Sequence, residues 1–202
     1  MNRFKPKDYY FDKAKAQGFK ARSIFKLEEI DKNLKLLKPD FIILDLGCAP
    51  GSWLQYVAKG ISNKGAALGV DLTPVPEVIH PRIKTVVDDC FLLTHEKIAY
   101  YLQDLIPEFA QFDVILSDMA PKTSGIKHVD QIRSFNLAEK ALDLAEVFLR
   151  PGGHVIIKVF GQKEVEDLLL RMKGMFKTAR PMRPKSIRAP SKELYVVGIA
   201  KK

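Results

Sequence analysis

The chain has 202 residues, of which 47% are hydrophobic and 28% charged, proportions ordinary for a soluble globular protein. No apolar run approaches the ~20 residues that cross a bilayer, and residues 1–7 lack the apolar core of a signal peptide. Two cysteines provide no disulfide framework. We therefore expect one cytosolic domain spanning residues 1–202, with no membrane partner.

The formal net charge of +9 is concentrated at the two ends of the chain. Residues 1–26 hold eight Lys and Arg against two acids, and residues 171–202 hold ten against one. The middle, residues 27–170, has a net charge of −6. Basic segments that also carry aromatic residues suit stacking on unpaired bases and predict a nucleic-acid partner. Solvated tails that aid solubility are the alternative.

Hydrophobic periodicity predicts the elements in chain order. Residues 1–20 lack a clear period and are expected to form a basic, flexible arm. The expected elements are then a helix at 23–35 capped by Ser23, a strand at 41–46, a helix at 53–59, strands at 66–71 and 83–87, a helix at 94–106, a strand at 112–117, helices at 131–149 and 163–174 on either side of a strand at 154–160, and two final strands at 176–182 and 194–200. This alternation predicts an α/β fold with a mostly parallel sheet and one reversed element at its edge.

The most informative stretch is a strand that ends in an acid and a glycine turn, Asp45-Leu-Gly-Cys-Ala-Pro-Gly-Ser-Trp53. Gly47 and Gly51 lack the third glycine of the dinucleotide fingerprint, and no Lys-Ser/Thr pair of a P-loop follows them. A ligand with a ribose and a base but no pyrophosphate fits this turn better. S-adenosylmethionine is such a ligand, so we expect it to bind here.

Charged residues follow the predicted strands at the edge where ligands bind in open α/β sheets. They are Asp45, Asp71, Asp88, Asp89, Asp118 and Lys158. Lys158 interrupts an apolar run, and burying its ammonium is costly unless it is paired or loses its proton. The alternative is a lysine that extends from the strand end into solvent. Histidines and cysteines do not approach the spacing of metal ligands, so no metal is expected.

The chain resembles the FtsJ-like (RrmJ-type) ribosomal RNA 2′-O-methyltransferases over nearly its whole length. The matching blocks are Ala21-Arg-Ser-Ile-Phe-Lys-Leu-Glu-Glu-Ile30, the glycine turn Asp45–Trp53, Ser117-Asp-Met-Ala-Pro121, Ile157-Lys-Val-Phe160 and Ser191-Lys-Glu-Leu-Tyr195. The resemblance implies a Rossmann-like methyltransferase fold with a seven-stranded sheet and a reversed C-terminal strand. It implies a catalytic tetrad, Lys26, Asp118, Lys158 and Glu193, and cofactor contacts from Gly51, Trp53, Asp71, Asp89 and Asp118. Both basic ends must then meet at the catalytic face.

The resemblance also implies the reaction, methylation of a ribose 2′-OH by S-adenosylmethionine. The expected substrate is a uridine of large-subunit ribosomal RNA, and the expected enzyme is a monomer with no obligate protein partner. Lys158 would accept the hydroxyl proton as a neutral amine, or remain charged and stabilise the developing alkoxide. Three alternatives stay open: 2′-O-methylation of transfer RNA, methylation of a base amino group, and a non-catalytic RNA-binding module. Lys122 argues against the base methyltransferases, whose related loop has an aromatic after its prolines.

Overall fold

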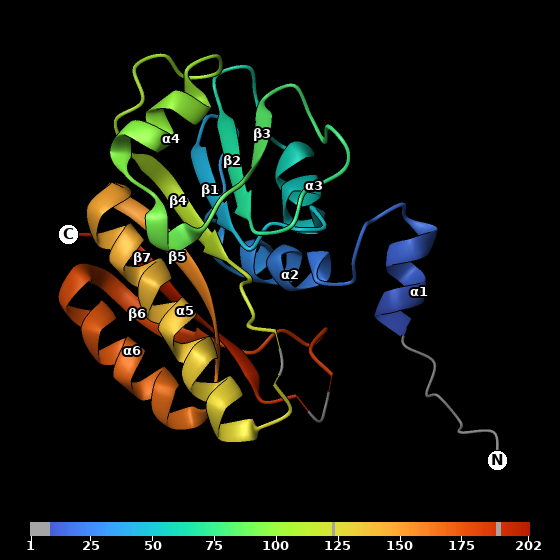
Figure 1. Cartoon of the computed structure of the whole chain (residues 1–202), viewed down its shortest axis with the longest axis vertical. Coiled ribbons are helices and arrows are strands. Elements are labelled where there is room, and N and C mark those ends of the chain that lie inside the picture. The colour runs from blue at the N-terminus through green and yellow to red at the C-terminus, as the bar shows by residue number, and fades with distance from the viewer. Residues whose placement is uncertain (1–8, 123, 189–190) are drawn as a thin grey trace.

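The structure is a computed structural model that describes residues 9–122, 124–188 and 191–202. A seven-stranded sheet runs through the molecule, with helices on both of its faces (Figure 1). The elements are α1 (Tyr9–Ala16), α2 (Ile24–Leu34), β1 (Ile42–Leu46), α3 (Ser52–Ala58), β2 (Ala66–Asp71), β3 (Ile83–Val87), the 3₁₀ turn η1 (Cys90–Leu92), α4 (His95–Leu102), β4 (Phe112–Ser117), α5 (Lys127–Phe148), β5 (Leu149–Phe160), α6 (Gln162–Met175), β6 (Phe176–Met182) and β7 (Glu193–Lys201). The predicted α/β fold is confirmed.

The strand order β3-β2-β1-β4-β5-β7-β6 places the first strand near the middle of the sheet. β1 pairs in parallel with β2 on one side and with β4 on the other, so the chain order reverses between β1 and β4. Loops that leave the carboxyl ends of these two strands go in opposite directions and open a crevice between them. The crevice is therefore expected at the ends of β1 and β4.

The reversed strand does not lie at the edge of the sheet, contrary to the prediction. β7 runs antiparallel to both β5 and β6 and is inserted between them, so β6 forms the edge. The difference in apolar content between β7 and β6 explains their order in the sheet. Tyr195, Val196 and Val197 in β7 are fully buried, whereas most of β6 is exposed or half-buried. A strand covered on both faces belongs inside a sheet, and a polar strand belongs at its edge.

Helices on the two faces enclose two apolar layers. α4, α5 and α6 cover one face and bury residues such as Leu142 and Leu168. α2 and α3 cover the other face with residues such as Leu27 and Leu54. No described helix, the 22-residue α5 included, is long and apolar enough to cross a membrane.

The N-terminal segment has more regular structure than the sequence indicates. Residues 9–16 form α1, which lies beyond α2 in Figure 1 and packs through Ala14 against Ile24 and Phe25. The Lys13 ammonium lies 4.6 Å from the centre of the Phe25 ring. Residues 1–8 of the expected flexible arm lie outside the described residues, and the flexibility stays a prediction.

Several helix boundaries also differ from the predicted ones. The helix expected at 94–106 ends at Leu102, and α5 begins at Lys127, before the expected position 131. Ser23 precedes α2 as predicted but does not cap it through its side chain, because its hydroxyl lies 2.6 Å from the hydroxyl of Ser52 in α3. The serine thus joins two helices on one face of the sheet.

Candidate active site

The glycine turn after β1 lies tightly against the segment that follows β4. Gly47 and Gly51 have φ angles of +75° and +104°, which L side chains rarely adopt. A Cβ on Gly47 would lie 2.9 Å from the Cα of Met119, and one on Gly51 would lie 2.7 Å from the Ile79 side chain. Both positions therefore require glycine, and the turn can bring its backbone close to a ligand.

Two predicted cofactor residues end the neighbouring strands and hold their loops. The Asp71 carboxylate accepts hydrogen bonds from the backbone N–H groups of Ala49, at 3.0 Å, and Thr73, at 2.8 Å. It therefore ties β2 to the glycine turn. Asp89 follows β3 and accepts from the Phe91 N–H at 3.0 Å, which caps the 3₁₀ turn. Each carboxylate oxygen has two lone pairs, so both residues retain capacity for a ligand.

Trp53 lies in the core at the start of α3. Its side chain is buried, its indole N–H donates to the Ser23 carbonyl at 2.9 Å, and its ring centre lies 5.8 Å from that of Tyr195. The indole thus connects α2, α3 and β7. Its predicted contact with the cofactor stays a prediction.

Asp45 is a buried carboxyl group without a described partner, next to the glycine turn. The residue is fully buried at the end of β1, and neither carboxylate oxygen has a hydrogen-bond partner among the described residues. Burial raises the pKa of this carboxyl well above its usual range, and the charges of Asp118 and Asp71 raise it further. A cationic ligand would relieve this repulsion. S-adenosylmethionine combines a positive sulfonium with a ribose, so the residues present fit it.

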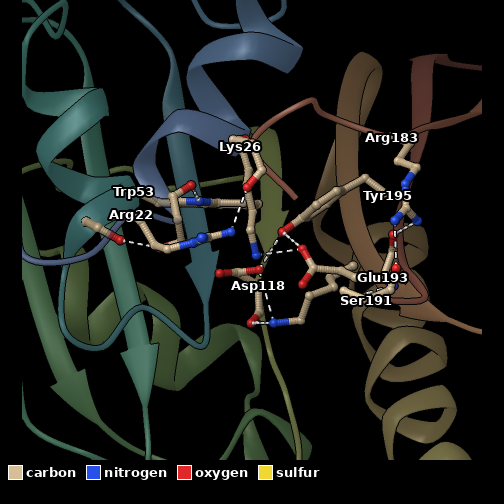
Figure 2. A network of polar contacts seen from close by, with 12 residues as sticks. Arg22, Lys26, Trp53, Asp118, Arg183, Ser191, Glu193 and Tyr195 are labelled. Atoms are coloured by element: carbon tan, nitrogen blue, oxygen red, sulfur yellow. Dashed lines mark hydrogen bonds and ion pairs between the residues drawn. The ribbon is translucent and has the colours of Figure 1, made fainter. Parts of the chain in front are cut away.

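The four predicted catalytic residues form two ion pairs. Lys26 in α2 lies 2.6 Å from the Glu193 carboxylate in β7. Lys158 in β5 lies 3.0 Å from the Asp118 carboxylate after β4, and also donates to the Asp118 carbonyl. Figure 2 shows the side chains of Lys26, Asp118 and Glu193 converging from separate elements. Only 7% of the Lys158 side chain is exposed, so it does not extend into solvent.

Tyr195 connects the two ion pairs. Its hydroxyl lies 2.7 Å from the Asp118 carboxylate and 2.9 Å from the Glu193 carboxylate (Figure 2). Burial raises the pKa of Tyr195 well above its usual range, and the two carboxylates raise it further. The phenol therefore keeps its single proton, which it donates to one carboxylate at a time.

No role was predicted for Tyr195, although it belongs to a block that carries the family resemblance. Its spacing of two residues from Glu193 could have indicated such a role. Residues two apart in a strand face the same side, so Tyr195 shares its face with Glu193.

Both basic ends of the chain meet beside the ion pairs. The Arg22 guanidinium donates to the Ser186 carbonyl at 2.7 Å, which ties the start of α2 to the loop between β6 and β7. Glu29 in α2 accepts from the Lys185 N–H of the same loop at 2.8 Å. Among the described residues, no group of three or more His, Cys, Asp or Glu could hold a metal ion.

Comparisons with known proteins identify the family. The FtsJ-like methyltransferase family model matches residues 19–201. A ribosomal RNA large subunit methyltransferase E from Bdellovibrio bacteriovorus is 43% identical, with 98% of this chain and 99% of the relative covered. One of the same name from Desulfatibacillum aliphaticivorans is 42% identical, with 97% and 91% covered. The crystal structure of a ribosomal RNA methyltransferase from Plasmodium falciparum matches with a TM-score of 0.76 and 27% identity over 91% of this chain and 98% of that one. The chain belongs to the FtsJ-like methyltransferase family.

Proposed function

We propose that the protein transfers a methyl group from S-adenosylmethionine to a ribose 2′-oxygen of RNA, with a uridine of large-subunit ribosomal RNA as the target. The observation that carries the proposal is the buried Lys158 amine, held by Asp118 at the edge where the glycine turn lies. The names of the relatives support ribosomal RNA as the substrate. We expect the enzyme to act as a monomer in the cytoplasm.

The cofactor site would be formed by Gly47, Gly51, Trp53, Asp71 and Asp89, together with Asp118 beside the catalytic lysine. S-adenosylmethionine, when bound, supplies a methyl group on a positively charged sulfur that an oxygen nucleophile can accept. The glycines would let the backbone approach the ligand, and Asp71 would accept hydrogen bonds from ribose hydroxyls. The buried charge of Asp45 would favour binding of the cation.

Lys158 would interact directly with the 2′-hydroxyl of the substrate. Its nitrogen has three positions for hydrogen bonds, and two of them face oxygens of Asp118. The third is available for the ribose. As a neutral amine it would accept the hydroxyl proton, and as an ammonium it would stabilise the developing alkoxide.

The other members of the tetrad would position these groups. Asp118 holds Lys158 through two oxygens, and the Lys26–Glu193 pair lies on the opposite side of the Tyr195 hydroxyl. This connected set keeps the amine in one orientation. Alignment of bound reactants of this kind can contribute about 7–11 kcal/mol to lowering a barrier.

The test is methyl transfer with labelled S-adenosylmethionine, offered separately to large ribosomal subunits that lack the modification and to transfer RNA. The expected product is a 2′-O-methyl uridine in the large-subunit RNA, identified because the adjacent linkage resists alkaline cleavage. A methyl on a base would contradict the proposal, and methylation of transfer RNA alone would overturn the assigned substrate.

Lys158→Ala should reduce the rate at least about 100-fold, because it removes the group that handles the hydroxyl proton. Lys158→Met is the second variant, since it replaces the buried stem. Lys32→Ala is the control on α2, where an exposed lysine pairs only with Glu28. Circular dichroism checks that each variant is folded. Transfer near the wild-type rate by a folded Lys158 variant would show that the assigned role is wrong.

A further inference from the structure

A cavity of about 640 Å³ lies beside the tetrad on the β4–β5–β7 half of the sheet edge. It is lined by residues that include Pro121, Ser134, Phe160, Gly161, Lys192 and Leu194, and by none of the predicted cofactor residues. Its volume is that of a pocket for a small ligand. Pro121, Phe160 and Leu194 follow Asp118, Lys158 and Glu193 within three residues. The cavity therefore adjoins the segments that carry three of the tetrad residues, although its lining includes no tetrad residue and no residue of the glycine turn.

Polar atoms without partners lie at the wall of this cavity. Ser134 in α5 is 4% exposed, and its hydroxyl has no hydrogen-bond partner among the described residues. Ser134 is one of the residues that line the cavity, and rotation about its Cα–Cβ bond gives the hydroxyl three staggered positions. One oxygen of Glu164, next to Gly161, is also buried without a described partner. Such groups are costly to bury, so a ligand that pairs with them is favoured.

The remaining lining indicates the kind of ligand. Phe160 offers a half-buried aromatic ring, while Arg183 and Lys192 line the cavity as exposed cations. A ligand with a flat face, a polar edge and an attached negative charge complements these three features. A nucleotide has all of them, because its base can stack on the ring and its phosphate can meet the cations.

We propose that the cavity binds the base of the nucleotide whose 2′-oxygen is methylated, turned out of its stack. This inference rests on the proposed function. The base is attached to C1′, next to the carbon that bears the 2′-oxygen, so a ribose at Lys158 must place its base nearby. The Phe160 ring centre lies 6.0 Å from the Lys158 nitrogen, which puts a stacking surface at the required place. The cavity would then select the nucleotide that is modified.

Steady-state kinetics on large ribosomal subunits tests the proposal. Ser134→Ala should raise KM for the subunits about two- to tenfold by removing one hydrogen bond to the base. Phe160→Leu should raise it about tenfold by removing the stacking surface. Both variants should leave kcat nearly unchanged, because the lost contacts exist before and during methyl transfer. Ser186→Ala is the matched control, since that serine is equally buried and unpartnered among the described residues but does not line the cavity.

A second measurement separates this proposal from the proposed function. Uridine 5′-monophosphate is titrated to millimolar concentration into the ¹⁵N-labelled protein while the backbone amide signals of Ser134 and Gly161 are followed. If the wild type methylates ribosomal RNA but both variants keep its KM, the cavity proposal is overturned and the function stands. If the wild type methylates no RNA, the proposed function is wrong, and the titration alone tests whether the cavity binds a nucleobase. Shifts at both amides, reduced in Phe160→Leu, support nucleobase binding, and their absence refutes it.

Discussion

The buried carboxyl group of Asp45 has opposite consequences for stability and for ligand binding. Without a described hydrogen-bond partner, it destabilises the cofactor-free protein wherever it is ionised. Asp45→Asn keeps the shape and removes the charge. The variant should melt about 2–4 °C higher near neutral pH, the change that ~1 kcal/mol produces in a chain of this size. Calorimetry should show weaker binding of S-adenosylmethionine, since a negative charge that would attract the cationic cofactor is gone.

The effect of Asp45→Asn should depend on pH. The raised pKa means that the folded protein holds this proton more tightly than the unfolded chain does. Wild-type stability is therefore lost as the pH rises from the ordinary aspartate pKa of about 3.9 through the raised value. The asparagine side chain does not ionise and causes no such loss of stability. The stability of Asp45→Asn relative to wild type should therefore increase with pH over this range. The control is Asp104→Asn at an exposed carboxylate, and a variant less stable than wild type near neutral pH would contradict the assignment.

At the scale of single residues, the sequence predicted which charges gather but not how they are connected. Lys158 was recognisable because a charge interrupts an apolar strand, and the glycines because of their turn. The bridging hydroxyl of Tyr195 was not, since a tyrosine in an apolar strand is usually a core residue. Its role depends on Asp118, which lies 77 positions away in the chain, and periodicity carries no information about such a contact.

One end of α5 is stabilised by a residue from β7. The Lys201 ammonium donates to the carbonyl oxygens of Ala145, Glu146 and Leu149, which lie at the carboxyl-terminal end of α5. Lys201→Met should lower the free energy of unfolding by about 1–3 kcal/mol, because the carbonyls lose a charged donor. Urea denaturation measures the change.

Lys202→Met is the matched control for this prediction. The neighbouring lysine is exposed, and its side chain has one described hydrogen bond, to the Lys173 carbonyl. Its substitution should change stability by less than about 0.5 kcal/mol. Equal losses in the two variants would show that Lys201 does not cap the helix.

At the scale of elements, six of the seven strands were predicted close to their observed bounds, because apolar strands bounded by turn residues are a strong local signal. β5 begins at Leu149, five residues before the predicted position 154, and its pairing with β4 is irregular there. The position of β7 in the sheet was not predicted. An edge strand and an inserted strand of similar composition differ only in the strands that pair with them. α1 was also missed. Its eight residues have a weak apolar face, and the helix packs mainly through Ala14 against a distant aromatic cluster.

At the scale of the whole molecule, the two basic ends of the chain meet next to the tetrad. Lys185 belongs to the loop that α2 holds next to the tetrad. If this loop contacts phosphates, Lys185→Gln should weaken RNA binding and reduce the slope of log affinity against log salt by about one. Filter binding at several salt concentrations measures the slope.

Lys64→Gln is the control for the salt experiment. Lys64 is exposed and precedes β2, so it lies at the amino-terminal edge of the parallel strands, opposite the site. Lys64→Gln removes the same charge as Lys185→Gln, but it should leave the slope of log affinity against log salt unchanged. A reduced slope for Lys64→Gln, or an unchanged one for Lys185→Gln, would mean that RNA does not follow the predicted face.

If the tetrad acts as proposed, the insertion of β7 between β5 and β6 makes methyl transfer dependent on a complete sheet. Glu193 and Tyr195 both enter on β7, which is held by backbone hydrogen bonds on both sides. Any transient opening of that strand withdraws the partner of Lys26 and the link to Asp118 together. A partly unfolded molecule that keeps the glycine turn could still capture its cofactor, but Lys158 and Asp118 would lack the hydrogen bond from Tyr195 and the neighbouring Lys26–Glu193 pair.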